Sequence, residues 1–267
     1  MIEFAYHLKA RNETLFYYGI ACLALAIFFL LLTKGTHTQV NNVNAWYKPF
    51  KFALSTCLFA WAMAWYCHYL PAFNIGLFNW TVVYLLGFEI VYIAFQASKG
   101  QLSHFNVSTP VYAALYSFMA LAAALVTLYT AYVGYLFFTN DFPGLPTYYV
   151  WAIRLGIFIF VVFSFEGFVM GSRLSHTIGG ADGGAGIPIL NWSTKFGDPR
   201  IAHFIGMHAL QVLPILSFYL FKNLKATIAM SLLYGLLALF TLAQALQGKP
   251  LFTAKQTVTS KDGLHPL

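Results

Sequence analysis

Six ionisable side chains in this sequence could together form one buried polar site. Two carboxylates lie within long apolar runs, two imidazoles lie near the start of a third run, and two more imidazoles follow such runs. Ionisable residues in membrane-spanning segments are costly and mark functional sites. Imidazole and carboxylate groups ligate iron, copper or zinc, and they also transfer protons. We therefore predict a metal or haem site with Glu89 and Glu166 as catalytic residues and with the ligands His104, His176, His203 and His208.

The spacing of His203 and His208 limits how these two residues can act together. Five residues turn an α-helix by about 500°, which places the two rings about 140° apart. We therefore expect one ring to face the site and the other to face a loop or a second site. A haem with two axial ligands could pair His104 or His176 with His203, and a haem with one axial histidine is equally consistent. The sequence lacks the H-x-x-H-H boxes of the membrane desaturases.

Four other polar residues lie near this set and are expected to bind the cofactor. The segment NAWYKPFKFALS carries Lys48 and Lys51. These lysines either extend to lipid head groups or bind the anionic group of a lipid or of an acidic substrate. Arg173 and Gln211 lie close to the glutamates and histidines in sequence or on neighbouring turns.

A zinc hydrolase is a weaker alternative. Ser103 and Ser175 each precede a histidine. Asp182 and Asp198 lie with Ser175 in the long loop of residues 172–199. A serine next to a histidine in sequence is not a catalytic dyad, however. The Gly-rich run GGADGGAG in this loop lacks the G-K-[ST] ending and the preceding strand of a phosphate-binding loop, so we expect a capping loop over the site.

The elements that must position these residues are membrane helices. Of the 267 residues, 60% are hydrophobic and only 9% are charged, which requires lipid as the solvent. Backbone groups in lipid must be paired internally, so each apolar run should be a helix. The sequence predicts an all-α, integral membrane bundle in one domain, residues 1–248, followed by a polar cytoplasmic tail, 249–267. The seven predicted spans are 15–33, 49–70, 77–97, 111–138, 147–171, 200–222 and 226–247.

The basic residues predict the orientation of the bundle. Lys9, Arg11, Lys222 and Lys225 fall on the side of the N-terminus, and every other Lys or Arg except Arg154 falls on the opposite side. Cytoplasmic loops carry the excess of positive charge, so the N-terminus should lie outside and the C-terminus in the cytoplasm. The net charge of +7 thus reflects topology, and the sequence contains no nucleic-acid motif. For Arg154, within a span, we expect extension toward the outer interface or a contact with Asp141.

Three segments together resemble a family of uncharacterised bacterial inner-membrane proteins with seven helices. The segments are NAWYKPFKFALS, QASKGQLSHFN and NWSTKFGDPRIAHFIGMHALQVLP. The resemblance covers most of the chain from 44 to 214. It implies a seven-helix protein of the bacterial inner membrane, and it transfers no activity and no catalytic residue.

These observations favour an oxidoreductase with a polar site in the cytoplasmic half of the membrane. Its cofactor would be a metal ion (iron, copper or zinc) or haem, and its substrate a lipid-soluble molecule or a quinone. A proton-coupled transporter or receptor without metal would use the same Glu and His residues to move protons or to bind substrate. A third alternative is a structural subunit of a larger membrane complex. Membrane lipids are expected partners, and a homo-oligomer is consistent with the sequence.

Overall fold

The computed structural model describes residues 2–253 and contains eight α-helices in this range. Seven of them are long and apolar enough to cross a membrane, which confirms the predicted all-α membrane bundle. The elements are α1 (Ile2–Arg11), α2 (Glu13–Gly35), β1 (Gln39–Val40), β2 (Val43–Asn44), α3 (Tyr47–Cys67), α4 (Ile75–Ser98), α5 (Pro110–Thr139), α6 (Thr147–Arg173), α7 (Arg200–Leu216), the π-helix η1 (Ser217–Phe221) and α8 (Leu224–Leu246). Of the predicted tail, residues 254–267 lie outside the described residues.

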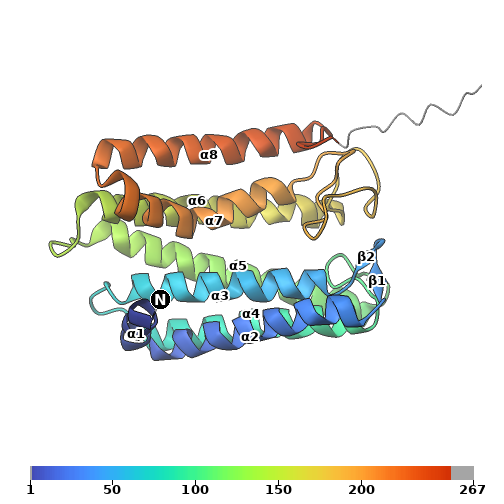
Figure 1. Cartoon of the computed structure of the whole chain (residues 1–267), viewed down its shortest axis with the longest axis horizontal. Helices are drawn as coiled ribbons and strands as arrows, with labels where there is room; N and C mark the ends of the chain where they lie inside the picture. Colours follow the sequence, from blue (N-terminus) through green and yellow to red (C-terminus); the bar gives the residue numbers. More distant parts are fainter. Residues whose placement is uncertain (1, 254–267) are drawn as a thin grey trace, which may run out of the picture.

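The N-terminal segment precedes the first predicted span and forms a helix of its own. Helix α1 lies across one end of the bundle, whereas the long helices run side by side (Figure 1). Its Leu8 is buried in the main core. Asn12 then caps α2, since its side-chain oxygen accepts a hydrogen bond from the backbone N–H of Leu15 at 3.1 Å. A polar segment outside the spans is thus anchored by one apolar residue and one cap.

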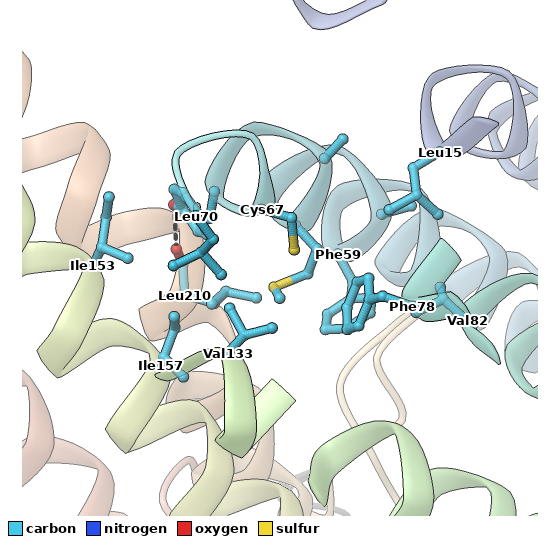
Figure 2. Packing of buried hydrophobic residues seen from close by; sticks show 14 of the residues in the cluster. Leu15, Phe59, Cys67, Leu70, Phe78, Val82, Val133, Ile153, Ile157 and Leu210 are labelled. Carbon is cyan, nitrogen blue, oxygen red and sulfur yellow. Dashed lines mark hydrogen bonds between the residues drawn. The ribbon is translucent and has the colours of Figure 1, made fainter. Parts of the chain in front are cut away.

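The spanning helices pack tightly at one end of the bundle, which we call the closed end. This end holds the first turns of α2, α4 and α6 and the last turns of α3 and α5. Figure 2 shows Cys67, Phe59, Leu210 and Phe78 in the buried hydrophobic cluster of this end. The Tyr66 hydroxyl donates to the Leu210 carbonyl at 2.8 Å and ties α3 to α7. We call the opposite end the cavity end.

Two glycines allow α6 and α7 to approach closely. A Cβ on Gly156 would lie 2.9 Å from the backbone oxygen of Ala209, and one on Gly206 would lie 2.1 Å from the Phe163 ring. Small residues at such contacts let helix backbones meet in a membrane, where packing replaces the hydrophobic effect as the driving force.

Pro214 does not end its helix. Helix α7 continues through this residue and then widens into η1, which is buried at Ser217. A proline removes one backbone donor, and local π-type adjustment and hydroxyl groups commonly compensate for this in membrane helices. Here the Ser217 hydroxyl meets the Thr227 hydroxyl at 2.7 Å and joins η1 to α8.

Arg154 is held by the backbone and makes no ion pair with Asp141 in the described part of the chain. Its Nε donates to the Phe137 carbonyl at 2.7 Å, and its Nη2 lies 3.4 Å from the Asn140 carbonyl oxygen. These carbonyls end α5, where the helix dipole favours a cation. The expected contact with Asp141 is therefore wrong.

The cavity end carries the longer connections. Strands β1 and β2 form a short antiparallel hairpin, which the all-α prediction did not include. The loop after α6 is ordered by two isolated bridges, Ile178 with Gly197 and Gly186 with Ser193. The three cysteines, Cys22, Cys57 and Cys67, are free and buried inside the bundle.

Candidate functional site

A large cavity opens at the cavity end, between α3 and α4 on one side and α5 to α7 on the other. Its volume is about 1040 Å³, at the upper end of the range for small-molecule sites. Apolar side chains line the part nearest the closed end, among them Phe59 and Phe160, whose rings stack 5.4 Å apart. Polar side chains gather near the loops. The cavity is thus amphipathic along its length.

The four histidines named from the sequence all line this cavity. In each of them Nδ1 has a hydrogen-bond partner, whereas Nε2 has none among the described residues. The Nδ1 partners of His104, His176, His203 and His208 are the Ser103 hydroxyl at 3.3 Å, the Asp182 carboxylate at 2.7 Å, the Phe163 carbonyl at 2.7 Å and the Gln211 amide oxygen at 3.3 Å. A carbonyl or carboxylate partner makes Nδ1 the donor and leaves the Nε2 lone pair available.

His176 and Asp182 form the most constrained pair in the cavity. Asp182 also accepts hydrogen bonds from the Ser175 hydroxyl at 2.9 Å and from the Thr177 hydroxyl at 2.8 Å. Burial by itself raises the pKa of Asp182, but the hydrogen bonds from His176 and Thr177 more than offset this and hold the pKa below its usual value. Burial lowers the pKa of His176 to about 4, although the bond to Asp182 acts in the opposite direction. At neutral pH the pair is therefore a carboxylate and a neutral imidazole.

His104 is held among aromatic rings. The centroid of its ring lies 5.4 Å from that of Phe52 and 6.3 Å from that of Tyr116. Burial, followed by the nearby Lys48 ammonium, lowers the pKa of His104 well below its usual value. His104 is thus a second neutral imidazole at the loop end of the cavity.

The two glutamates occupy different positions. Glu89 lines the cavity, and its Oε1 is buried without a hydrogen-bond partner in the part of the chain that the structure describes. Glu166 is not among the lining residues and lies behind His203, with its Oε2 3.4 Å from Nδ1 of that ring. The structure therefore brings Glu89 to the cavity surface and places Glu166 beside a cavity histidine.

His203 and His208 both line the same cavity, which differs from the expectation that only one of the two rings faces the site. His203 faces α6, where a Cβ added to Gly167 would lie 3.2 Å from its Cε1. His208 packs against Phe204 of its own helix, with ring centroids 4.4 Å apart. The cavity is wide enough to meet two faces of α7.

The expected cofactor-binding residues divide into two groups. Lys48, Lys51 and Gln211 line the cavity, whereas Arg173 is exposed at the end of α6 and outside its lining. The Lys51 ammonium donates to the Leu190 carbonyl at 3.0 Å. Lys48 has no acceptor within residues 2–253.

No group of three or more His, Cys, Asp or Glu residues in the described range is arranged to hold a metal ion. Of the residues considered for a hydrolase, Ser175 and His176 both bond to Asp182 and not to each other, whereas Asp198 pairs with Arg200 through Nε at 2.8 Å. The sequence points to Asp182 only as a hydrolase residue, and its position six residues after His176 is the signal that could identify the pair. Trp192 and Tyr116, which also line the cavity, carry no sequence signal of that kind.

Comparison of the chain with known protein families, with curated proteins and with solved structures finds no match, so the function must be argued from the cavity itself.

Proposed function

We propose that this protein takes a lipid-soluble molecule into the cavity and acts on it as a membrane oxidoreductase with a haem or metal cofactor. The observation that carries the proposal is the state of the four histidines, each held through Nδ1 with Nε2 unpartnered at the cavity. Metal-ligating histidines are commonly oriented in this way by a carboxylate or carbonyl behind the ring. The amphipathic cavity suits a lipid-soluble substrate or a quinone.

Haem fits this arrangement better than an ion held by three protein ligands. A haem needs only one or two axial imidazoles, and its macrocycle needs an apolar space. Four histidines that line the cavity would supply the first, and the apolar lining near Phe59 and Phe160 would supply the second. In the predicted orientation, this site faces the cytoplasm in a bacterial inner membrane.

The test is an absorption spectrum and elemental analysis of the detergent-purified protein. We expect a haem absorption band, or about one equivalent of iron, copper or zinc, that is lost when one or two of the four cavity histidines are replaced by alanine. His37→Ala is the matched control, because His37 is exposed and lies outside the cavity lining. A folded protein without colour or metal would contradict the cofactor.

A proton-coupled transporter or receptor is the second candidate, and Glu89 favours it. A carboxyl group that lines the cavity with an unpartnered Oε1 could hold a proton and release it when a ligand binds. Infrared difference spectra across a pH titration would show the carboxylic acid band of Glu89, and Glu89→Gln should remove that band. Glu166→Gln serves as the comparison. A band unchanged by Glu89→Gln would exclude this role.

A further inference from the structure

We propose that Lys48 binds the carboxylate of a lipid-soluble acid whose apolar chain lies in the inner part of the cavity. This inference deepens the proposed function by naming the class of ligand. It rests on that function only in requiring that the cavity takes a lipid-soluble molecule, whatever the cofactor.

The contacts at the loop end leave Lys48 as the cation that is available to a ligand. Arg200 is engaged by Asp198 and also donates to the Asn191 carbonyl. Lys51 donates to the Leu190 carbonyl. The Lys48 ammonium, which lines the cavity and is half-buried, has no such acceptor within the described chain. An ammonium group without an acceptor in a low-dielectric environment attracts an anion.

The charges nearby set the charge of the ligand. Three basic residues, Lys48, Lys51 and Arg200, line the loop end of the cavity, and the acidic residues of the adjoining loop are Asp182 and Asp198. The neighbouring histidines, His104 and His176, are neutral. Basic side chains thus outnumber acidic ones at this end, and two of the three basic groups already have acceptors, which favours an anionic group beside Lys48.

The inner part of the cavity determines the polarity of the rest of the ligand. From Lys48 the lining continues along α3 through Phe52 and Ser55 to Phe59 and reaches Phe160 on α6. The side chains become apolar in that direction, so a polar head at the loops requires an apolar body below it. A volume of about 1040 Å³ suits one small-molecule ligand.

The lysine also brings the head group to the histidines. Lys48, His104 and His176 all line this cavity, and the Phe105 ring packs against both imidazoles, with centroids 6.2 Å from His104 and 4.7 Å from His176. A carboxylate held by Lys48 would therefore lie close to the region of the unpartnered Nε2 atoms.

Quenching of tryptophan fluorescence tests this assignment, because Trp192 lines the cavity against Phe204. The probes are a brominated long-chain fatty acid and its methyl ester, and Trp192→Phe identifies the signal of the cavity. We expect the acid to bind at least about tenfold more tightly than the ester, as for a hydrogen bond to a charged group. Lys48→Gln should abolish this preference without changing the affinity for the ester.

Two further variants make the result specific. Lys99→Gln removes an exposed lysine that lies over the Phe95 ring, and it should leave the preference intact. Lys48→Arg keeps the charge and should retain most of the preference. Its retention would show that the loss in Lys48→Gln comes from the missing charge and not from misfolding.

The possible failures can be told apart. Equal affinities for acid and ester would overturn the carboxylate site and leave the cavity as a lipid-binding site. Absence of any Trp192 quenching by either probe would overturn the cavity as a site for lipid-soluble molecules, and with it the proposed function. Loss of a bound cofactor in Lys48→Gln, with the preference for the acid unchanged, would assign the lysine to the cofactor and overturn its role in binding the acid.

Discussion

At the closed end of the bundle, the Arg154 guanidinium donates to the carbonyls that end α5, whereas at the cavity end the Lys48 ammonium has no acceptor in the described chain. Uncharged groups follow the same division. Asn12 and Asn79 bond each other reciprocally at 2.9 Å at the closed end, while Nε2 of the four cavity histidines has no partner among residues 2–253. Arg11 departs from this pattern, as does the Tyr18 hydroxyl: within the described chain the Arg11 Nη1 is buried without a partner, although the guanidinium lies 3.7 Å from the Trp65 ring centroid.

The difference separates polar groups that stabilise the fold from polar groups that are available to a ligand. A buried polar group without a partner costs free energy, and a fold tolerates this where the group serves function. Both ends contain ionisable residues within apolar runs, so the residue types alone do not distinguish them. The distinction lies in whether the fold supplies an acceptor.

The largest expected effect concerns the tight packing near the closed end. Gly156→Leu should lower the free energy of unfolding by about 3 kcal/mol, because the new side chain would collide with the Ala209 backbone. Gly235→Leu is the control, since the nearest side-chain atom to an added Cβ there is at 3.5 Å. Thermal unfolding in detergent measures both. Equal loss in the two variants would contradict the close α6–α7 contact.

The two cations compared above should differ in their contribution to stability. Arg154→Gln removes hydrogen bonds from a charged donor to the end of α5 and should cost about 2 kcal/mol. Lys48→Gln should leave the stability unchanged or raise it, because it removes a charge that has no acceptor. The same unfolding assay compares them. A destabilised Lys48→Gln variant would show that its ammonium stabilises the fold.

The His176–Asp182 pair should make stability depend on pH. The folded-state pKa of His176 is about 4 and its ordinary value is 6.5, so the unfolded chain takes up a proton first as the pH falls. From about pH 7 to about pH 5 this costs about 2 kcal/mol of stability, and Asp182 contributes only at lower pH. His176→Asn should make the pH dependence shallower, whereas His37→Asn, at an exposed loop position, should not. An unchanged slope in His176→Asn would mean that the pKa of this ring is the same in the folded and the unfolded chain, which would contradict the buried neutral imidazole.

The smallest expected effect is the coupling between Asn12 and Asn79. A double-mutant cycle with alanine should give about 1 kcal/mol, since the two amides satisfy each other in a buried position. The Ser103–His104 contact at 3.3 Å, in the cavity, should give a smaller coupling. A larger coupling at the cavity than at the closed end would reverse the comparison.

The sequence predicts the bundle well because apolar runs of about twenty residues have one stable outcome in lipid. Helix α1 cannot be predicted in this way, because its position depends on the burial of Leu8 and on the cap that Asn12 provides to α2. The hairpin of β1 and β2 cannot be predicted in this way either, because each strand has only two residues and no measurable periodicity.

The site is predictable in its residue types and less so in its contacts. Carboxylates and imidazoles in apolar runs point to Glu89 and the histidines without any structure. Which nitrogen of His203 is occupied depends on the Phe163 carbonyl, forty residues away in the sequence. The hydrogen bond between His176 and Asp182 depends on the backbone conformation of a Gly-rich loop. Hydrophobic periodicity carries no information about that conformation.

Cys22, Cys57 and Cys67 are buried, so the native chain exposes none of these thiols to a labelling reagent. Gly144 lies in the connection between α5 and α6, at the closed end, and Gly184 lies in the loop between α6 and α7, at the cavity end. A Cβ at either position would meet open space. Gly144→Cys or Gly184→Cys would therefore introduce a single accessible thiol, and labelling of intact cells with an impermeant maleimide would assign each end of the bundle to its side of the membrane.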